Sequence, residues 1–452
     1  MFENMDEKQA KKKILELVSE YYHKYQSQEK PFVPGDSVRY AGRVYNQEEL
    51  INGVDSVLEF WLTAGRYTEQ LENTLKKYLN IKHVALTNSG SSANLIAFMA
   101  LTSPLINKNR RIYPGDEVIT VAAAFPTTVT PIIQFGAVPV FVDIKIPNYN
   151  IDVSKLEAAL SDKTKAVFIA HTLGNPFNVK EVKRFCDRHD LWLIEDNCDA
   201  LGAEYIIDDI SRKTGTIGDI GTSSFYPAHH MTMGEGGAVY TDNPTLYRAM
   251  MSFRDWGRDC HCLGGHDNMC GHRYDGQYGE LPKGYDHKYV YSHFGYNLKV
   301  TDIQAAVACA QIKKLPEFVI RRRENADYLR VQLSDAAEEL YLPEVDGNAV
   351  PSWFGFPITV KKGISRDAVV QALEANNIQT RMLFSGNLIK HPCFNEMRKV
   401  RKGYRIVGGL EETDRTLYET FWVGVFPGMT KGMLDYTAKV IKDAVAKEKA
   451  AK

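Results

Sequence analysis

Short apolar runs alternate with helical patterns between residues 83 and 240. Six continuous apolar runs, too short for helices, predict β-strands at residues 84–87, 117–121, 138–142, 166–170, 191–194 and 222–226. Between them, apolar residues recur at helical spacing, most clearly over residues 93–101 and 179–189. Apolar strands interleaved with helices indicate a parallel sheet that is covered on both faces. We therefore predict an α/β domain whose functional residues follow the carboxyl ends of the strands.

The regions on either side of this alternation have other patterns. Before residue 26, apolar and aromatic residues at helical spacing predict one amphipathic helix. After residue 297, a helical pattern over residues 303–333, broken or kinked at Pro316, precedes strands predicted near residues 354–360. These patterns divide the chain into three parts: an N-terminal helical arm (1–50), a large α/β domain (51–296) and a smaller C-terminal α+β domain (297–452).

Composition and charge narrow the class of protein. The 452 residues are 44% hydrophobic and 25% charged, which suits a folded protein with a substantial core. Lysine and arginine total 55 against 56 acidic residues, so the net charge gives no reason to expect binding to nucleic acid or to an anionic membrane. No apolar stretch approaches the length of about 18 residues that a membrane span needs, and the first residues lack a signal core. We expect a cytoplasmic protein.

A serine-rich motif follows the first predicted strand. Residues 87–94 read Thr-Asn-Ser-Gly-Ser-Ser-Ala-Asn and directly precede a predicted helix. Free backbone amides at the start of a helix, together with serine hydroxyls and a glycine that allows close approach, bind phosphate well. Gly90 and Ser91 are therefore candidate phosphate ligands. The alternative is that these serines only cap the helix.

A second motif follows the last predicted strand of the alternation. Residues 223–237 read Ser-Ser-Phe-Tyr-Pro-Ala-His-His-Met-Thr-Met-Gly-Glu-Gly-Gly. His229 lies on the turn that follows the strand, where α/β enzymes place chemistry. An ordinary loop with two solvated or buried histidines would explain the residues equally well.

This second motif resembles the site of pyridoxal-phosphate sugar aminotransferases of the DegT type, which carry Ser-Phe-x-x-x-Lys and then Glu-Gly-Gly. Ser224 matches the serine, and His229 stands where those enzymes have the lysine that holds the cofactor covalently. An imidazole transfers protons but cannot hold an aldehyde as lysine does. The resemblance therefore implies a fold type I pyridoxal-phosphate transferase that binds its cofactor non-covalently. The amine form, pyridoxamine 5'-phosphate, fits best, and pyridoxal phosphate would also be held without a covalent bond.

The same resemblance assigns further cofactor contacts. Gly90 and Ser91 match the phosphate site, Asp196 matches the residue that pairs with the pyridine nitrogen, and Phe125 matches the residue that stacks on the ring. Without the resemblance, Asp196 would be read as a turn cap and Phe125 as a core residue. Asp199 departs from the glutamine or histidine that is common in the aminotransferases.

Cysteines form a third departure from the aminotransferases. Cys260, Cys262 and Cys270 lie in a long aperiodic segment, residues 254–293, and Cys198 closely follows Asp196. Four thiolates around a metal would order such a segment. The spacing alone leaves structural zinc, an iron-sulfur cluster and coincidental thiols open.

Taken together, the motifs resemble one branch of the family, the pyridoxamine-phosphate and iron-sulfur dependent 3-dehydrases of nucleotide-linked 4-keto-6-deoxy-hexoses. Ser-Phe-Tyr-Pro-Ala-His-His, Met-Gly-Glu-Gly-Gly, Phe-Arg-Asp-Trp-Gly-Arg-Asp-Cys and Gly-Tyr-Asp-His-Lys-Tyr carry the likeness, which runs from about residue 31 to residue 436. The branch implies a 2Fe-2S cluster on the four cysteines and a separate flavin-dependent or iron-sulfur reductase. A hairpin inserted within residues 206–214 would explain the longer first gap between cysteines.

The function implied is reductive removal of the C3 hydroxyl from a nucleotide-linked sugar, in 3,6-dideoxyhexose biosynthesis. His229 is the expected base, and Tyr226 and Asp199 are expected beside it. Asn297 matches a family residue that reaches the partner subunit's cofactor phosphate, which implies a homodimer. The likeness is closest for CDP-4-keto-6-deoxy-D-glucose, and dTDP and GDP sugars stay open.

Three other functions are compatible with these residues. A redox-neutral 3-dehydratase needs no cluster, and a sugar aminotransferase needs a lysine in the site, whereas Lys213 and Lys283 lie outside the motif. The third is a non-catalytic, zinc-stabilised protein that binds nucleotide sugars. Metal content distinguishes the last alternative from the reductive enzyme.

Overall fold

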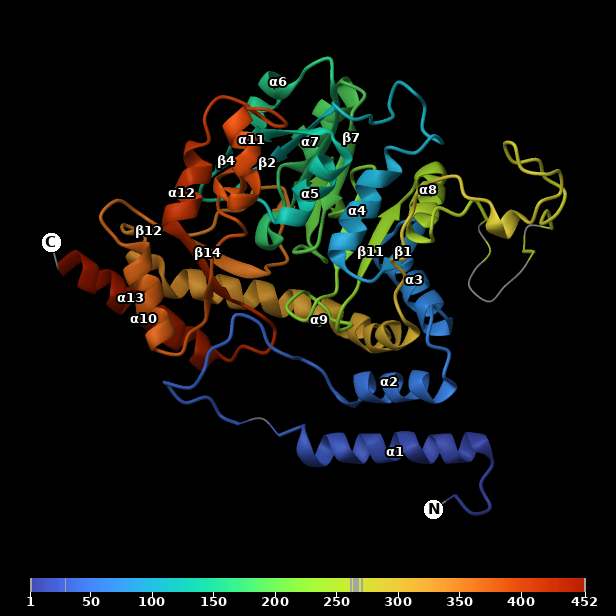
Figure 1. Cartoon of the computed structure of the whole chain (residues 1–452). Coiled ribbons are helices and arrows are strands. Elements are labelled where there is room, and N and C mark those ends of the chain that lie inside the picture. Colours follow the sequence, from blue (N-terminus) through green and yellow to red (C-terminus); the bar gives the residue numbers. More distant parts are fainter. Residues whose placement is uncertain (1, 29, 261, 263–267, 270, 451–452) are drawn as a thin grey trace.

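The computed structural model describes residues 2–28, 30–260, 262, 268–269 and 271–450. Figure 1 shows a large domain built around a central sheet and, beside it, a smaller domain that contains the C-terminus. The long helix α9 (Asp302–Gln332) runs along the base of both, and helices α1 (Glu7–Tyr25) and α2 (Gln47–Glu59) lie beneath it.

An eight-stranded sheet forms the centre of the large domain, in the order β1-β11-β10-β7-β6-β2-β3-β16. Its strands are β1 (His83–Thr87), β2 (Glu117–Val121), β3 (Val138–Val142), β6 (Thr164–Ala170), β7 (Trp192–Asp196), β10 (Ile220–Ser224), β11 (Gly237–Thr241) and β16 (Arg405–Ile406). Only β11 is antiparallel to its neighbours, β1 and β10. The mostly parallel α/β sheet that the sequence predicts is confirmed.

Alternate residues of the central strands pack against helices on opposite faces of the sheet. Val167 belongs to one buried cluster with Phe185 of α7 (Val179–Arg188), and Phe168 belongs to another with Phe98 of α4 (Gly90–Ala100). The other helices of this domain are α3 (Arg66–Leu79), α5 (Pro126–Phe135), α6 (Leu156–Ala159) and α8 (Pro244–Arg254). Continuous apolar strands are stable here because both of their faces are covered.

Most predicted elements lie within a few residues of their observed bounds. The predicted strand at 222–226 is the largest difference among the strands, because β10 ends at Ser224 and the chain then turns. The predicted hairpin within 206–214 is confirmed as β8 (Glu204–Ile207) and β9 (Ile210–Lys213), which pair antiparallel. Of the break or kink predicted at Pro316, the break is wrong, since α9 continues through this residue and buries Leu315 and Phe318 on either side.

The C-terminal part contains a four-stranded antiparallel sheet, in the order β12-β14-β17-β15. Its strands are β12 (Leu340–Tyr341), β14 (Gly355–Val360), β15 (Thr380–Arg381) and β17 (Thr420–Gly424), and the helices of this part besides α9 are α10 (Arg366–Ala375), α11 (Asn395–Val400), α12 (Glu411–Glu419) and α13 (Lys431–Ala450). Two small pairings complete the strands: β4 (Ile144–Lys145) with β5 (Asn150–Ile151), and β13 (Ala349–Val350) with β8. Because β16 pairs with β3, this part of the chain also contributes to the large sheet.

The segment between α1 and α2 is tied to the small domain. Val38 forms a parallel bridge with Ile378, and the amide of Gln379 donates to the carbonyl oxygen of Val38 at 2.9 Å. The residues between α1 and α2 therefore lie against β15 and help to shape the small domain's inner surface.

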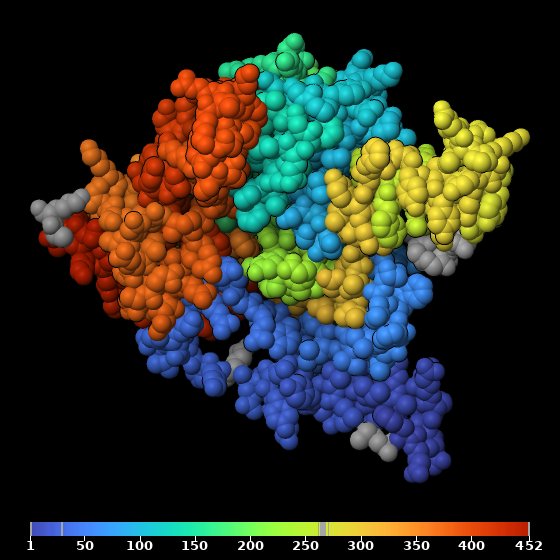
Figure 2. All heavy atoms as spheres, viewed as in Figure 1, coloured from blue at the N-terminus to red at the C-terminus, as the bar shows by residue number. Residues whose placement is uncertain are grey.

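The described residues of segment 254–293 stand out from the body beside α8 (Figures 1 and 2). Apart from the short 3-10 helix His287–Tyr289, they contain single bridges and turns. Within the described residues, no helix combines the length and the apolar character that crossing a membrane requires.

Candidate active site

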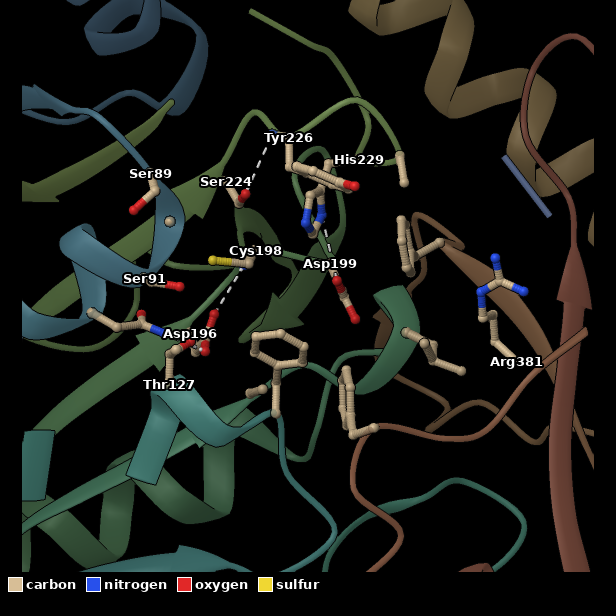
Figure 3. Close-up of a pocket in the computed structure, with 18 of the residues that line it drawn as sticks. Ser89, Ser91, Thr127, Asp196, Cys198, Asp199, Ser224, Tyr226, His229 and Arg381 are labelled. Atoms are coloured by element: carbon tan, nitrogen blue, oxygen red, sulfur yellow. Dashed lines mark hydrogen bonds and ion pairs between the residues drawn. The ribbon is translucent and has the colours of Figure 1, made fainter. Parts of the chain in front are cut away.

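A cavity of about 410 Å³ opens where the carboxyl ends of the large sheet's strands face the small domain. Its wall includes residues at the ends of β1, β6, β7 and β10, the start of α5, and residues of β15 and β17. Figure 3 shows that the polar side chains labelled there come from several separate elements and converge on this space. Such a position is where open α/β sheets bind ligands.

The N-terminus of α4 meets the cavity. Ser89 caps the helix, and its hydroxyl accepts from the Ser92 amide at 3.0 Å. Gly90 packs so closely against β10 that a Cβ there would lie 2.4 Å from the Ser224 Cβ and 3.0 Å from the Cys198 Sγ. Amides of the first helical turn have no acceptor within the helix, so they are available to an anion. Gly90 and Ser91, the predicted phosphate ligands, both line the cavity.

Asp196, the last residue of β7, is held by three donors. Its Oδ2 accepts from the Asn94 side-chain amide and from the Thr128 hydroxyl, each at 2.8 Å, and its Oδ1 accepts from the Cys198 backbone amide at 3.2 Å. The carboxylate is 4% exposed and lines the cavity. It therefore presents a fixed negative group to anything bound there.

Sequence reasoning missed the two side chains that fix Asp196. Asn94 lies four residues after Gly90, hence on the same side of α4, and that spacing was a usable signal. Thr128 lies in the first turn of α5, where a threonine is usually read as an ordinary helix-start residue.

Phe125 immediately precedes α5, and its ring forms part of the cavity wall. The side chain is 50% exposed, so it is not a core residue. It contacts Phe384 of the small domain edge-on, with ring centroids 6.3 Å apart. A half-exposed aromatic face inside a cavity suits stacking on a planar ring.

His229 lies on the turn after β10 and faces Asp199 across 3.4 Å, measured from Nδ1 to Oδ1. Burial, together with the positive charge of Arg322, lowers the pKa of His229 to about 4, although Asp196 acts in the opposite direction. Burial and the negative charge of Asp196 raise the pKa of Asp199 well above its usual value. The site thus pairs a neutral imidazole with a carboxyl group that favours its protonated form, which is an arrangement for proton transfer.

Tyr226 and Ser224 complete this side of the cavity. The Tyr226 backbone amide donates to the Ser224 hydroxyl at 3.4 Å, and the Tyr226 ring lies 6.3 Å from the His229 ring, centroid to centroid. Tyr226 is 46% exposed, so its hydroxyl can meet a bound molecule. The structure therefore brings together Tyr226, His229 and Asp199, the three residues predicted for catalysis (Figure 3).

Two residues from the C-terminal part support His229, and the sequence did not point to either. Phe354 stacks on the imidazole with centroids 5.0 Å apart and planes inclined by 20°. The Arg322 guanidinium on α9 donates from Nη2 to the His229 carbonyl oxygen at 3.1 Å and from Nη1 to the Trp353 carbonyl oxygen at 3.0 Å. Arg322 is 2% exposed, yet it stands in an Arg-Arg-Arg run that reads as a charged surface.

Asn297, predicted for cofactor binding, is not part of this cavity's wall as the structure describes it. It forms an antiparallel bridge with Asp255, and its side chain accepts from the Lys299 ammonium at 2.9 Å. The residue is exposed, at the base of the projecting segment 254–293. Any contact with a cofactor phosphate would have to be made outside its own chain's cavity.

The model of the DegT/DnrJ/EryC1/StrS aminotransferase family matches residues 44–442. The chain belongs to this family. It is 52% identical to the lipopolysaccharide biosynthesis protein RfbH of Salmonella typhimurium, over 96% of this chain and 97% of that protein. It is 46% identical to dTDP-4-dehydro-2,6-dideoxy-D-glucose 3-dehydratase of Saccharopolyspora spinosa, over 97% of this chain and 93% of that protein.

Solved structures agree with this family assignment. The structure of E. coli GDP-4-keto-6-deoxy-D-mannose-3-dehydratase with bound hydrated PLP has a TM-score of 0.78 and 28% identity, and the match covers 89% of this chain and 99% of that one. The same enzyme with a trapped PLP-glutamate geminal diamine also gives a TM-score of 0.78. The predicted pyridoxal-phosphate aminotransferase fold is confirmed, and this member of the DegT/DnrJ/EryC1/StrS family is an enzyme.

The residues of the cavity fit the family's pyridoxal-type cofactor. The α4 N-terminus offers amides to a phosphate, Gly90 leaves no room for a side chain, and Asp196 is fixed by three donors. Phe125 exposes a face for stacking. Among the described residues no lysine lines the cavity. The site is therefore suited to hold the cofactor without a covalent bond.

The predicted cysteine cluster does not fit in the same way. Cys198 lines the cavity, whereas Cys260 and Cys262 line a separate hollow between α3 and the end of α8. Those two are close together, since the Cys262 amide donates to the Cys260 Sγ at 3.4 Å. Cys270 lies outside the described residues, and the rest of the described chain gathers no metal-binding group of three or more His, Cys, Asp or Glu. Spacing along the chain did not reveal that Cys260 and Cys262 line a different hollow from Cys198.

Proposed function

We propose that this enzyme removes the C3 hydroxyl from a nucleotide-linked 4-keto-6-deoxy-hexose with pyridoxamine 5'-phosphate as its cofactor. The observation that carries the proposal is His229, which by the sequence resemblance stands where the family has its lysine and which faces Asp199 inside a cavity whose described wall contains no lysine. A transaminase needs that lysine, but a dehydratase that starts from the amine cofactor needs only an acid and base. Relatives named as sugar-nucleotide 3-dehydratases, at 46% and 34% identity, support the same reading.

Each part of the cavity then has a function in holding the cofactor. The amides and hydroxyls around Gly90 and Ser91 would bind its phosphate, Asp196 would face its pyridine nitrogen, and Phe125 would lie against its ring. When bound, the cofactor would supply an amine able to condense with a ketone and a ring able to accept electrons from the adjacent carbon–hydrogen bond. Ser224, packed against Gly90, sets how close the helix start lies to the strand.

His229 is the proposed base, and its neutral imidazole accepts a proton at the cofactor's methylene carbon. Asp199, 3.4 Å away, has a raised pKa and can exchange a proton with the imidazole. Tyr226, whose half-exposed ring lies 6.3 Å from the imidazole, centroid to centroid, is the residue that we propose donates a proton to the departing C3 hydroxyl. Phe354, stacked on the imidazole, excludes water from its other face.

A decisive experiment follows proton exchange directly. The protein is loaded with pyridoxamine phosphate and a CDP-, dTDP- or GDP-linked 4-keto-6-deoxy-hexose in heavy water, and loss of the methylene proton signal is followed by NMR. We expect substrate-dependent exchange in the wild type and its loss in the His229→Asn variant. Exchange that survives in this variant would contradict the proposed role of His229. If instead glutamate converts bound pyridoxal phosphate into the amine form and sustains turnover, the enzyme is an aminotransferase.

We also propose that the removal of the C3 hydroxyl is reductive. The resemblance to the iron-sulfur dependent branch, to which Cys198, Cys260, Cys262 and Cys270 contribute, implies a reductive enzyme with a 2Fe-2S cluster and a separate flavin-dependent or iron-sulfur reductase, acting on CDP-4-keto-6-deoxy-D-glucose. Because the described cysteines do not come together in one chain, we derive no step through a cluster. Iron and sulfide assays on anaerobically purified protein test this form. A metal-free protein that still releases the C3 hydroxyl would be the redox-neutral dehydratase, and zinc without turnover would favour the binding protein.

We also propose that the enzyme is a homodimer in which Asn297 reaches the partner subunit's phosphate site. Its exposed position outside its own cavity is consistent with this contact. Light scattering gives the mass in solution, and an Asn297→Ala variant should bind pyridoxamine phosphate more weakly while keeping the dimer mass. Unchanged cofactor affinity would argue against the contact.

A further inference from the structure

Acidic side chains outnumber basic ones in the described wall of the cavity. Carboxyl groups are supplied by Asp196, Asp199 and Glu235, whereas Arg381 is the single arginine or lysine in the wall that the described residues form. The cofactor phosphate site at α4 relies on backbone amides and hydroxyls. A second, strongly anionic group entering this cavity would therefore find one cationic side chain.

Arg381 is held at the cavity by β-sheet pairing. It is the last residue of β15 and pairs with Trp422 of β17. Its guanidinium lies over the Tyr40 ring, 3.9 Å from the centroid, and Tyr40 in turn meets Trp422 edge-on with centroids 5.5 Å apart. A cation stacked on an aromatic ring that is itself packed against the sheet has a restricted position.

The segment that carries Tyr40 is also fixed to the same sheet edge. The Val38 amide donates to the Asn377 carbonyl oxygen at 2.9 Å, and the Tyr40 amide donates to the Gln379 side-chain oxygen at 3.4 Å. Tyr40 and Arg381 are thus held at the same sheet edge, although they lie far apart in the sequence. The N-terminal segment helps to build the site.

The Arg381 guanidinium keeps donors available for a ligand. Its Nη1 donates to the Thr380 carbonyl oxygen at 2.7 Å and the group stacks on Tyr40, and among the described residues it has no ion pair with a carboxylate. The side chain is exposed. In Figure 3 it stands on the opposite side of the cavity from Ser89 and Ser91, with His229 and Asp199 between. A sugar placed next to His229 could therefore extend its substituents toward Arg381.

We propose that Arg381, stacked on Tyr40, is the diphosphate-binding residue for the nucleotide-linked substrate. This inference rests on the proposed function, because it assumes that the sugar arrives attached to a nucleoside diphosphate. A guanidinium offers parallel N–H donors that match phosphate oxygens, and its charge offsets the repulsion from the cavity's carboxyl groups. The reacting sugar would lie between the cofactor and His229, and the nucleoside would lie beyond Arg381, toward solvent.

Ligand binding without turnover tests the proposal. CDP, dTDP and GDP, and the nucleosides cytidine, thymidine and guanosine, are titrated calorimetrically into protein loaded with pyridoxamine phosphate. We expect Arg381→Gln to weaken binding of the preferred diphosphate by about 10- to 100-fold, as for loss of a charge-assisted hydrogen bond, and to leave binding of its nucleoside unchanged. Arg381→Lys should restore part of the loss. Arg39→Gln, which removes an exposed arginine next to Tyr40, should change neither.

Other results would overturn the proposal. Equal weakening of diphosphate and nucleoside binding would place Arg381 against the base or make it a structural residue. Diphosphate binding that Arg381→Gln leaves unchanged, or that Arg39→Gln weakens equally, would also refute it. A failure of the proposed reaction can be told apart from a failure of this binding site. If no 4-keto sugar supports methylene exchange but Arg381→Gln still weakens only diphosphate binding, the binding site is supported and the proposed reaction is wrong.

Discussion

The Arg322 guanidinium donates from Nη2 to the His229 carbonyl oxygen at 3.1 Å, and this bond joins the long helix α9 to the turn that carries the proposed base. The same guanidinium donates to the carbonyl oxygens of Trp353 and Phe354. Since Phe354 stacks on the imidazole, one buried side chain holds both the backbone of His229 and the ring beside it. The position of the base therefore depends on a residue that need not touch substrate.

We predict that Arg322→Met lowers the rate of methylene exchange by about 10- to 100-fold, because small displacements of a catalytic group are costly, and changes pyridoxamine phosphate affinity little. The exchange rate is measured by NMR on samples quenched at successive times, and the affinity for pyridoxamine phosphate is measured by titration. Arg323→Met is the matched control: Arg323 also donates to two carbonyl oxygens, of Pro351 and Gly202, but not to His229. Equal losses in both variants would mean that Arg322 only stabilises the fold.

Gly90 gives a steric prediction at the phosphate site. A Cβ at this position would lie 2.4 Å from the Ser224 Cβ and 3.0 Å from the Ser224 Cα, so Gly90→Ala must push α4 away from β10. We expect the affinity for pyridoxamine phosphate to fall by about tenfold or more, because amides that approach a phosphate must be held in place. The cofactor's absorbance during titration measures the affinity.

Gly53 is the control for this change. It lies inside helix α2, and its nearest neighbour to a built Cβ would be the Val307 Cγ2 at 3.8 Å, an ordinary contact. Gly53→Ala should leave cofactor affinity unchanged and raise the free energy of unfolding by about 0.5–1 kcal/mol. A Gly90→Ala variant with unaltered affinity would show that the strand and helix separate without cost.

The strands and the residues next to them could be predicted because their signals are local. β2 and β3 coincide with the predicted ranges 117–121 and 138–142, since a continuous apolar run between turns has few other structures open to it. Gly90, Asp196 and His229 each lie at or shortly after the carboxyl end of a strand of one mostly parallel sheet, so the fold brings them to one cavity. Their convergence follows from topology.

Other parts of the site depend on packing between distant segments. Tyr40 and Arg381 are adjacent only because the chain before α2 pairs with the edge of the small domain's sheet, and nothing near Tyr40 in the sequence indicates that pairing. Arg322 is buried, but it stands in a run of three arginines, and such a run is normally predicted to lie on the surface. For the cysteines, spacing shows which residues are available but not that Cys198 lines one cavity and Cys260 and Cys262 another.

The Thr128 hydroxyl should matter for the cofactor although it does not contact the ring in our proposal. It donates to the Asp196 Oδ2 at 2.8 Å, and Thr128→Val removes this donor while keeping the side chain's shape. A hydrogen bond to a charged group is worth about 1.5–3 kcal/mol, so we expect pyridoxamine phosphate affinity to fall by about tenfold. Thr130→Val, on the same helix, removes only a bond to the Pro126 carbonyl oxygen and should have no effect. A similar loss of cofactor affinity in both variants would mean that the substitutions disturb helix α5 and not the hydrogen bond to Asp196.

The pairing of β16 with the large sheet gives a prediction of pH-dependent stability. Burial alone would raise the pKa of Glu117, but its hydrogen bonds with Arg405 and Ser161 outweigh burial and lower it. A carboxyl group with a lowered pKa binds fewer protons in the folded state than in the unfolded state. Its contribution to stability is therefore complete above the unfolded pKa and is lost as the pH falls through the folded one.

We predict that Glu117→Gln lowers the free energy of unfolding by about 1–2 kcal/mol near pH 7, since it removes a two-pronged ion pair between β2 and Arg405 on β16. The difference from the wild type should shrink as the pH falls below the ordinary glutamate value of 4.5, because the wild-type carboxyl group then also takes up a proton. Urea unfolding at several pH values measures this. Glu396→Gln, which breaks an exposed pair with Lys399, should change stability little at any pH. If the difference in the free energy of unfolding between the wild type and Glu117→Gln is the same at every pH, Glu117 stabilises the sheet edge by packing and not by its charge.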